Sequence, residues 1–161
     1  AGAVIVKPSA EPGILSTQLG ADGQYRDLLY YPVGASNQLA KAGTDEAAIQ
    51  MTGSEVFKVA VKTLGGIAAD TLDKAGIDKD ELDWLIPHQA NIRIIQATAK
   101  RLDLPMEKVI LTVQDHGNTS AASVPMALDV GIRDGRVKKG QLILMEAFGG
   151  GFTWGSVLMR L

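Results

Sequence analysis

The stretch WLIPHQANIRIIQATAKR, from Trp84 to Arg101, contains a change of hydrophobic pattern that decides the fold. The short apolar run that ends at Pro87 is typical of a buried strand. The residues after His88 repeat their apolar positions at intervals of three and four, which is typical of an amphipathic helix. A buried strand that runs directly into a helix indicates an α/β layered architecture. His88 lies at the junction, and the carboxyl ends of strands carry the ligand sites of open α/β sheets.

The same patterns predict the other elements of the chain. We expect strands at 1–6, 82–88, 108–113, 141–148 and 153–161, a hairpin made of 14–20 and 25–33 around the turn ADG, and a surface loop over 34–50. We expect helices from an N-cap at Ser54 to Gly76, over 89–102 and over 121–135, with Pro125 early in the last one. Gly65 and Gly66 weaken the first helix unless it packs closely there. Together these elements predict one α/β domain over 1–161, with a largely parallel sheet and an antiparallel edge made by the last two strands.

Length, net charge and cysteine content limit the classes of protein to which the chain can belong. The chain has 161 residues, a net charge of −2 and no cysteine. This length suits one domain with a substantial core, and the charge gives no global basic field for nucleic acid. Disulfides, thiolate metal sites and cysteine nucleophiles are excluded within the chain. No apolar run approaches the length of a membrane span. The start lacks both a signal-peptide pattern and an initiator methionine, so we expect a fragment or a processed chain.

The two histidines are the first candidates for chemistry. His88 is followed by Asn91 and His116 by Asn118, and each histidine follows a predicted strand. Both positions map to the carboxyl edge of the predicted sheet. A histidine after a strand can equally be a loop residue with a purely structural role, and for His116 we favour that interpretation. Asn118 can cap the following helix or point its amide at a substrate carbonyl.

The run FGGGFTWG, from Phe148 to Gly155, is the second candidate. Glycine lets a backbone N–H approach a ligand closely and could form an oxyanion hole, but a tight hairpin turn needs glycine as well. The spacing fits neither a dinucleotide-binding fingerprint nor a phosphate-binding loop, and the chain has no nucleophile elbow. Two widely separated histidines make a metal site a poor interpretation.

With these motifs in view, the chain resembles the β-ketoacyl-acyl-carrier-protein synthase III family, the initiating condensing enzymes of bacterial fatty-acid synthesis. The resemblance rests on EVFKVAV, DWLIPHQANIRII, HGNTSAASVPMAL and EAFGGGFTWGSVL and corresponds to the C-terminal half of the family's enzymes. It implies half of a thiolase-like fold, with helices packed on a mixed five-stranded sheet. It also implies a Cys-His-Asn catalytic set whose cysteine belongs to an N-terminal half that this chain lacks.

The resemblance assigns roles residue by residue. His88 and Asn118 match the family's histidine and asparagine, which donate hydrogen bonds to the thioester oxygen when decarboxylation of the malonyl group generates an enolate. Gly150 matches a glycine of the acylation oxyanion hole. The implied pantetheine channel comprises Met51, Gly53, Phe57, Ala90, Asn91, Ile94 and Phe148. The implied surface for acidic carrier protein comprises Lys58, Gln89, Arg93, Lys100 and Arg101.

The resemblance further implies a cytoplasmic acyltransferase with no metal and no cofactor beyond CoA and phosphopantetheine thioesters as substrates. The implied partners are the N-terminal half, acyl carrier protein, acetyl-CoA, a malonyl thioester and a second copy of the complete enzyme, with no nucleic acid and no membrane span. Without the cysteine, the chain alone is expected to be inactive in condensation. Two alternatives stay open: a non-catalytic domain that docks carrier protein or CoA, and a cleavage product that only stays packed against the other half.

Overall fold

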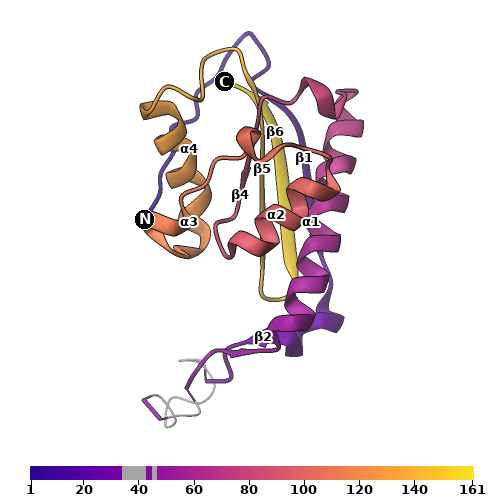
Figure 1. The fold of residues 1–161 in the computed structure, drawn as a ribbon, viewed down its shortest axis with the longest axis vertical. Helices are drawn as coiled ribbons and strands as arrows, with labels where there is room; N and C mark the ends of the chain where they lie inside the picture. Colours follow the sequence, from indigo (N-terminus) through magenta and orange to yellow (C-terminus); the bar gives the residue numbers. More distant parts are fainter. Residues whose placement is uncertain (34–42, 45–46) are drawn as a thin grey trace.

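The computed structural model describes residues 1–33, 43–44 and 47–161 and shows a three-layered α/β arrangement (Figure 1). The central sheet has four strands in the order β1-β6-β5-β4, namely β1 (Ile14–Ala21), β6 (Thr153–Arg160), β5 (Leu142–Gly149) and β4 (Trp84–Pro87). Helices α1 (Gly53–Ala75) and α2 (Ile92–Arg101) cover one face, and α4 (Ser123–Arg133) covers the other. The α/β class is therefore confirmed.

The sheet is mixed rather than largely parallel. β4 pairs with β5 in parallel, whereas β5–β6 and β6–β1 are antiparallel. The antiparallel final pair is as predicted, but β6 is not at the edge, because β1 pairs along its free side. A single parallel pair is all that one β–α–β crossover, from β4 to β5, can supply.

The expected fifth strand at 108–113 does not form. Val109 makes an isolated parallel bridge to Leu85, and Ile110 donates its N–H to the Leu85 carbonyl at 3.0 Å. The next backbone N–H groups, those of Thr112 and Val113, donate instead to the buried side chain of Gln89. The ladder therefore stops after one step, and the chain turns into the short helix α3 (Val113–His116).

The N-terminal third also differs from the sequence expectation. Residues 1–6 form no strand and lie beside α4, with Ile5 98% exposed. The ADG hairpin is wrong as well, since Asp22 exchanges backbone hydrogen bonds with Phe152 and thereby continues the β1–β6 pairing. A 3-10 helix (Gly23–Leu28) follows, and the two-residue strand β2 (Leu29–Tyr30) pairs with β3 (Gln50–Met51). Most of the loop expected over 34–50 lies outside the described residues.

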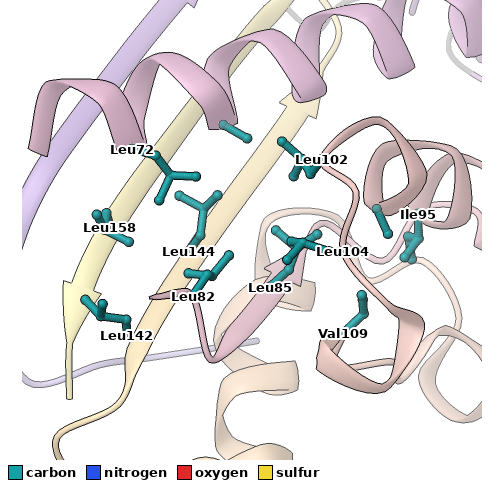
Figure 2. Packing of buried hydrophobic residues seen from close by; sticks show 12 residues of the cluster. Leu72, Leu82, Leu85, Ile95, Leu102, Leu104, Val109, Leu142, Leu144 and Leu158 are labelled. Carbon is teal, nitrogen blue, oxygen red and sulfur yellow. The ribbon is translucent and has the colours of Figure 1, made fainter. Parts of the chain in front are cut away.

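Two apolar clusters hold the helices to the sheet. The larger joins α1 and α2 to the strands through residues such as Leu72, Ile95, Leu85, Leu144 and Leu158 (Figure 2). The smaller joins α4 to the opposite face and includes Ile86, Ile143, Ile110, Ala127 and Leu128. Because neighbouring residues of β4 and β5 supply different clusters, β4 is apolar throughout and β5 is apolar up to Glu146. Short 3-10 helices, which the sequence patterns did not predict, lie in the connections at Lys79–Glu81, Met106–Lys108 and Ser120–Ala122. Within the described residues, no helix is both apolar enough and long enough to cross a bilayer.

The long helix begins and ends close to its predicted limits. Thr52 rather than Ser54 is the N-cap, and Gly76 ends the helix in the left-handed conformation with φ 66°. The predicted close packing holds for Gly65, where a Cβ atom would collide with the side chain of Arg101 on α2. It does not hold for Gly66, which has no atom within 4 Å of the position that a Cβ would take.

We expect Gly66→Ala to stabilise the protein by about 0.5–1 kcal/mol, because alanine restricts the unfolded chain and meets open space in the helix. Gly131→Ala on α4 is the matched comparison. Its new Cβ would lie 2.7 Å from Cγ2 of the buried Val137. Overpacking of this kind costs about 1–3 kcal/mol and outweighs the same gain in propensity. The midpoint of urea unfolding measures both, and a stabilising Gly131→Ala would contradict this account of α4 packing.

Candidate functional site

A cleft of about 830 Å³ opens where β4 and β5 end. The two strands are parallel, so their carboxyl ends meet at one edge of the sheet, where His88 follows β4 and Phe148 is the last residue but one of β5. The bridge between Leu85 and Val109 brings the segment that leads to Asn118 to the same edge. Consequently His88, Asn118, Phe148 and Gly150, which are far apart in the sequence, all line this one cleft.

The backbone and the ring of His88 are both held from within the chain. Its N–H donates to the Glu146 carbonyl at 2.8 Å, one step beyond the β4–β5 ladder. Its Nδ1 lies 2.6 Å from Oγ of Ser123, the first residue of α4. Burial lowers the pKa of His88 below its ordinary value of 6.5, because desolvation disfavours the charged ring. At neutral pH the side chain is therefore a neutral imidazole, with Nε2 as the nitrogen left for the cleft.

Asn118 is fixed in a corresponding way. Its Oδ1 accepts the N–H of Ser120 at 2.9 Å, which makes a local turn just before the 3-10 helix, whose N-cap position is Thr119. The N-cap of α4 is Ala122, so the helix-capping alternative for Asn118 is wrong, and its role as an amide donor stays a prediction. The carbonyl end makes the local turn, and the NH₂ end has no hydrogen-bond partner in the part of the chain that the structure describes.

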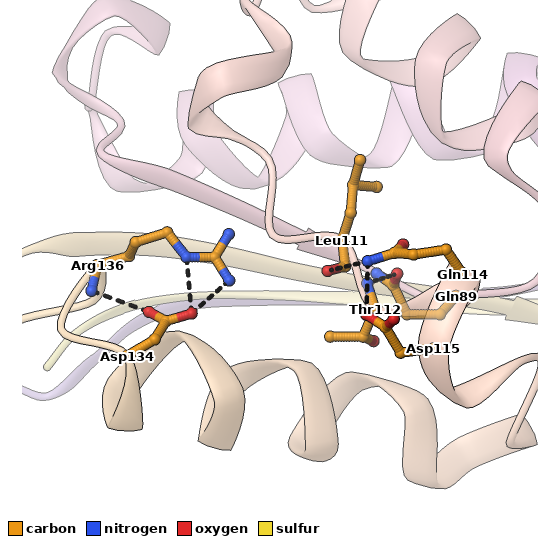
Figure 3. Close-up of polar contacts among 7 residues, drawn as sticks. All are labelled: Gln89, Leu111, Thr112, Gln114, Asp115, Asp134 and Arg136. Carbon is orange, nitrogen blue, oxygen red and sulfur yellow. Dashed lines mark hydrogen bonds and ion pairs between the residues drawn. The ribbon is translucent and has the colours of Figure 1, made fainter.

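Gln89 occupies the interior and corrects one sequence prediction. Its side chain is completely buried, so it cannot meet a carrier protein at the surface as predicted. Nε2 donates to the carbonyls of Pro87 and Ile110, and Oε1 accepts from the N–H groups of Thr112 and Val113. Figure 3 shows the contact between Gln89 and Thr112. With four hydrogen bonds the amide is saturated. Gln89 thus ties the end of β4 to the segment that leads to Asn118.

The glycine turn shapes another wall of the cleft. A Cβ at Gly150 would lie 3.2 Å from the carbonyl oxygen of Leu29, closer than an ordinary van der Waals contact, so a side chain there would push on the backbone of β2. Phe148 packs edge to face on the buried Phe152, with 4.6 Å between the ring centroids. Every residue predicted for the pantetheine channel lines this cleft: Met51, Gly53, Phe57, Ala90, Asn91, Ile94 and Phe148. Of these, Asn91 uses its Oδ1 to cap α2, where it accepts the N–H of Arg93 at 2.8 Å.

The predicted basic residues spread over two helices. Arg93 lies over the ring of Phe57, 5.6 Å from the centroid, and so stands beside the cleft. Lys58 on α1 pairs with Glu55 at 2.8 Å and remains largely exposed. Lys100 and Arg101 are exposed at the other end of α2, at ~1.5 Å of rise per residue roughly 10 Å from Arg93. Arg101 instead contributes to a separate groove between the carboxyl ends of α1 and α2.

Two functional candidates were missed from the sequence. Ser123 was not singled out because a serine near a helix start ordinarily caps the helix, whereas here it contacts His88. Glu146 had a visible signal, a carboxylate inside the apolar run LILMEAF, that was not interpreted. It is 2% exposed, and neither of its carboxylate oxygens has a hydrogen-bond partner among the described residues. Burial raises its pKa to about 8, so it is mostly protonated at pH 7.

Neither His116 nor metal binding adds to the candidate site in the described residues. His116 is exposed and does not line the cleft, and the structural role favoured for it stays a prediction. No cluster of three or more histidine, cysteine, aspartate or glutamate side chains that could hold a metal ion occurs in the described ranges.

Comparisons with known proteins agree with one another. Residues 72–161 match the family model for the C-terminal part of 3-oxoacyl-[acyl-carrier-protein] synthase III. The chain is 61% identical over 160 residues to the β-ketoacyl-[acyl-carrier-protein] synthase III of Thioalkalivibrio sulfidiphilus, covering 99% of this chain and 50% of that protein. For the protein of the same name from Methylococcus capsulatus the identity is 60%, with coverages of 99% and 49%. The chain thus spans about half the length of the curated relatives it matches.

Solved structures place the fold in the same group. The 3-oxoacyl-[acyl-carrier-protein] synthase III of Aquifex aeolicus superposes with a TM-score of 0.85 at 43% identity, over 96% of this chain and 46% of that one. The corresponding synthase of Thermus thermophilus gives a TM-score of 0.86 at 36% identity, over 96% and 48%. The chain therefore has the α/β arrangement of one half of these thiolase-like structures, with four strands in its sheet rather than the expected five.

The raised pKa of Glu146 predicts how the free energy of unfolding changes with pH. Its pKa is raised from 4.5 to about 8 in the folded state, so the folded state binds more protons than the unfolded state between these values. Its contribution is fully present below about pH 4.5 and is lost as pH rises towards 8. We expect the free energy of unfolding to fall between pH 5 and pH 8, and Glu146→Gln, which stays neutral, to flatten that slope. Urea unfolding across this range measures it, and equal slopes in both proteins would show that Glu146 is ionised in the native state.

Proposed function

The chain belongs to the β-ketoacyl-acyl-carrier-protein synthase III family, as its C-terminal part, and from this we propose that it supplies the decarboxylation half of a condensing active site. The complete enzyme would condense an acetyl group from acetyl-CoA with malonyl carrier protein at the start of fatty-acid synthesis. His88 and Asn118 would serve the malonyl step, and the acylated cysteine would come from outside this chain, which contains none.

One observation carries the proposal. His88 and Asn118 line the same cleft, and each has its acceptor-capable atom engaged by the chain itself, Nδ1 by Ser123 and Oδ1 by the Ser120 N–H. What each offers to the cleft is a nitrogen that can donate, Nε2–H of a neutral imidazole and the amide NH₂. A pair of neutral donors in a partly desolvated cleft suits an oxygen on which negative charge develops.

Malonyl decarboxylation develops such a charge. The bond between the α-carbon and the carboxylate breaks, carbon dioxide leaves, and the electron pair moves onto the thioester as an enolate. His88 and Asn118 would donate to the enolate oxygen. The α-carbon would then attack the acyl thioester on the cysteine, whose thiolate leaves. Neither residue needs to change its protonation state, which agrees with a histidine whose pKa is lowered by burial.

The remaining roles follow the geometry of the cleft. The mainly apolar lining from α1 and α2 would accept the pantetheine arm of CoA or of carrier protein, and the backbone N–H of Gly150 would join the oxyanion hole for acylation. Arg93, Lys58, Lys100 and Arg101 would form the surface for acidic carrier protein, from which the buried Gln89 is left out. The complete enzyme would act as a cytoplasmic homodimer, and this chain alone would not condense acyl groups, because it lacks the nucleophile.

We expect His88→Ala and Asn118→Ala to lower malonyl decarboxylation by ~10²–10³, the usual effect of removing one donor to a developing oxyanion, while cysteine acylation is preserved. The measurement is carbon dioxide release from malonyl carrier protein beside radiolabel transfer from acetyl-CoA, on the protein joined to its cysteine-bearing half. His116→Ala is the matched control, because His116 lies outside the cleft.

The two half-reactions separate this proposal from its rivals. If His88→Ala blocks acylation as severely as decarboxylation, the histidine is also the base for the thiol and the division of roles is wrong. If the joined protein binds carrier protein or CoA and turns over neither substrate, the chain belongs to a docking domain.

We expect Arg93→Glu to lower kcat/KM for malonyl carrier protein by about tenfold and to change use of malonyl-CoA much less, because charge reversal repels an acidic partner that the smaller thioester does not bring. Lys139→Glu is the control, since it reverses one exposed charge away from the cleft. Higher salt should shrink the wild-type preference for carrier protein. Equal losses for both substrates would place Arg93 in the channel or in the fold.

A further inference from the structure

Ser123 connects the two halves of the candidate site. It is the first residue of α4, 2% exposed, and its Oγ lies 2.6 Å from His88 Nδ1 and 3.1 Å from the backbone nitrogen of Gln89. These two are the only hydrogen bonds that this hydroxyl makes among the described residues. One serine side chain therefore contacts the imidazole and the residue next to it at once.

The number of hydrogens available to these groups decides which atom donates and which accepts in each contact. The Gln89 nitrogen can only donate, so Ser123 Oγ accepts from it. The hydroxyl then has one hydrogen to place, and Nδ1 of His88 is its one acceptor in the described part of the chain. If Nδ1 carried a hydrogen instead, the buried hydroxyl hydrogen would have no acceptor, which is costly in an interior. The arrangement requires Nδ1 to accept and leaves the ring hydrogen on Nε2.

The surroundings oppose the alternative in which the ring is charged. His88 is partly buried, and its Nδ1 faces the amino end of α4, an eleven-residue helix whose N-terminus carries partial positive charge. An imidazolium there would be desolvated and would meet a charge of its own sign. The neutral ring with Nε2–H is the one form that fits both the hydroxyl and the helix end.

We infer that Ser123 is a positioning residue that fixes His88 as the Nε2–H tautomer and so presents a hydrogen-bond donor to the cleft. The side chain of Gln89, which makes all four of its possible hydrogen bonds, supports this arrangement. By clamping Pro87, Ile110, Thr112 and Val113, it holds the backbone N–H that orients the Ser123 hydroxyl. The state of the ring follows from the structure, whereas its catalytic consequence rests on the function proposed above.

The tautomer can be measured without any assay of activity. In protein labelled with ¹⁵N-histidine, protonated and unprotonated ring nitrogens give distinct ¹⁵N shifts, and this chain has only two histidines to assign. The His88 signals are identified by their loss in His88→Gln, and the exposed His116 is the internal reference. At pH 7 we expect wild-type His88 to favour Nε2–H by about tenfold or more, the size set by an unsatisfied buried hydroxyl.

Three variants distinguish positioning from stability. Ser123→Ala should turn His88 into a mixture of tautomers, and Ser123→Thr, which keeps the hydroxyl, should restore the Nε2–H form. Ser156→Ala removes another buried hydroxyl, one that is hydrogen-bonded to Thr71, and should lower stability without changing the His88 signals. A wild-type Nδ1–H tautomer, or an unchanged preference in Ser123→Ala, would overturn the inference.

The kinetic arm tests the consequence separately. In the joined protein, Ser123→Ala should slow malonyl decarboxylation by about 10–100-fold, the usual effect of removing a group that orients a working histidine, and leave acylation unchanged. If the tautomer shifts and the decarboxylation rate does not, the proposed function of His88 fails while the role of Ser123 in setting the ring stands. If decarboxylation slows and the tautomer does not shift, the inference about Ser123 fails and the proposed function stands.

Discussion

The parallel pairing of β4 with β5 is the constraint on which the rest of the site depends. It places Pro87 beside Glu146, and the N–H of His88 continues the ladder by donating to the Glu146 carbonyl. Both strands are buried on both faces, so their register is fixed by two separate cores. The end of one strand thus presents a histidine, and the end of the other leads into the glycine turn. A one-residue slip would expose the core and move His88 away from Phe148.

A second constraint is that the acceptor atoms of the site residues are already hydrogen-bonded within the chain. Ser123 occupies Nδ1 of His88, the Ser120 N–H occupies Oδ1 of Asn118, and Gln89 spends all four of its hydrogen bonds on the backbone. Each contact uses a local or buried partner, so none of them requires a ligand. What remains for the cleft is a set of donors that are already oriented. Such preorganisation is what charge stabilisation needs, because the groups do not have to reorient during the reaction.

The buried Glu146 belongs to the same low-polarity surroundings. A carboxyl group with no partner among the described residues is stable there as the neutral acid, and the desolvation that raises its pKa also lowers that of His88. The two shifts have opposite directions and a common cause. Near neutral pH both groups are mainly uncharged, so the edge of the sheet under the cleft carries little charge that would compete with a developing enolate.

Much of this arrangement was determined by the sequence alone. The apolar run before His88 and the 3.6-residue period after it predict β4 and α2, and Gly76 and the glycine turn fix where α1 ends and where β5 reverses into β6, because these are local preferences of the backbone. The order of strands and helices also predicts that His88 and the glycine turn share one edge. The family motifs supplied Asn118 and the residues of the channel, which all line one cleft.

Only the tertiary structure decided the rest, because it depends on which segments meet. Residues 14–21 were apolar enough for a strand, but their partner is β6 rather than their sequence neighbour. Val109 and Ile110 have strand propensity, yet the amide of Gln89 takes the next backbone N–H groups and ends the ladder. The burial of Gln89 removes its side chain from the surface. The same packing places Ser123 next to His88. No local pattern reports such long-range hydrogen bonds, since each partner is chosen by the packing of the whole domain.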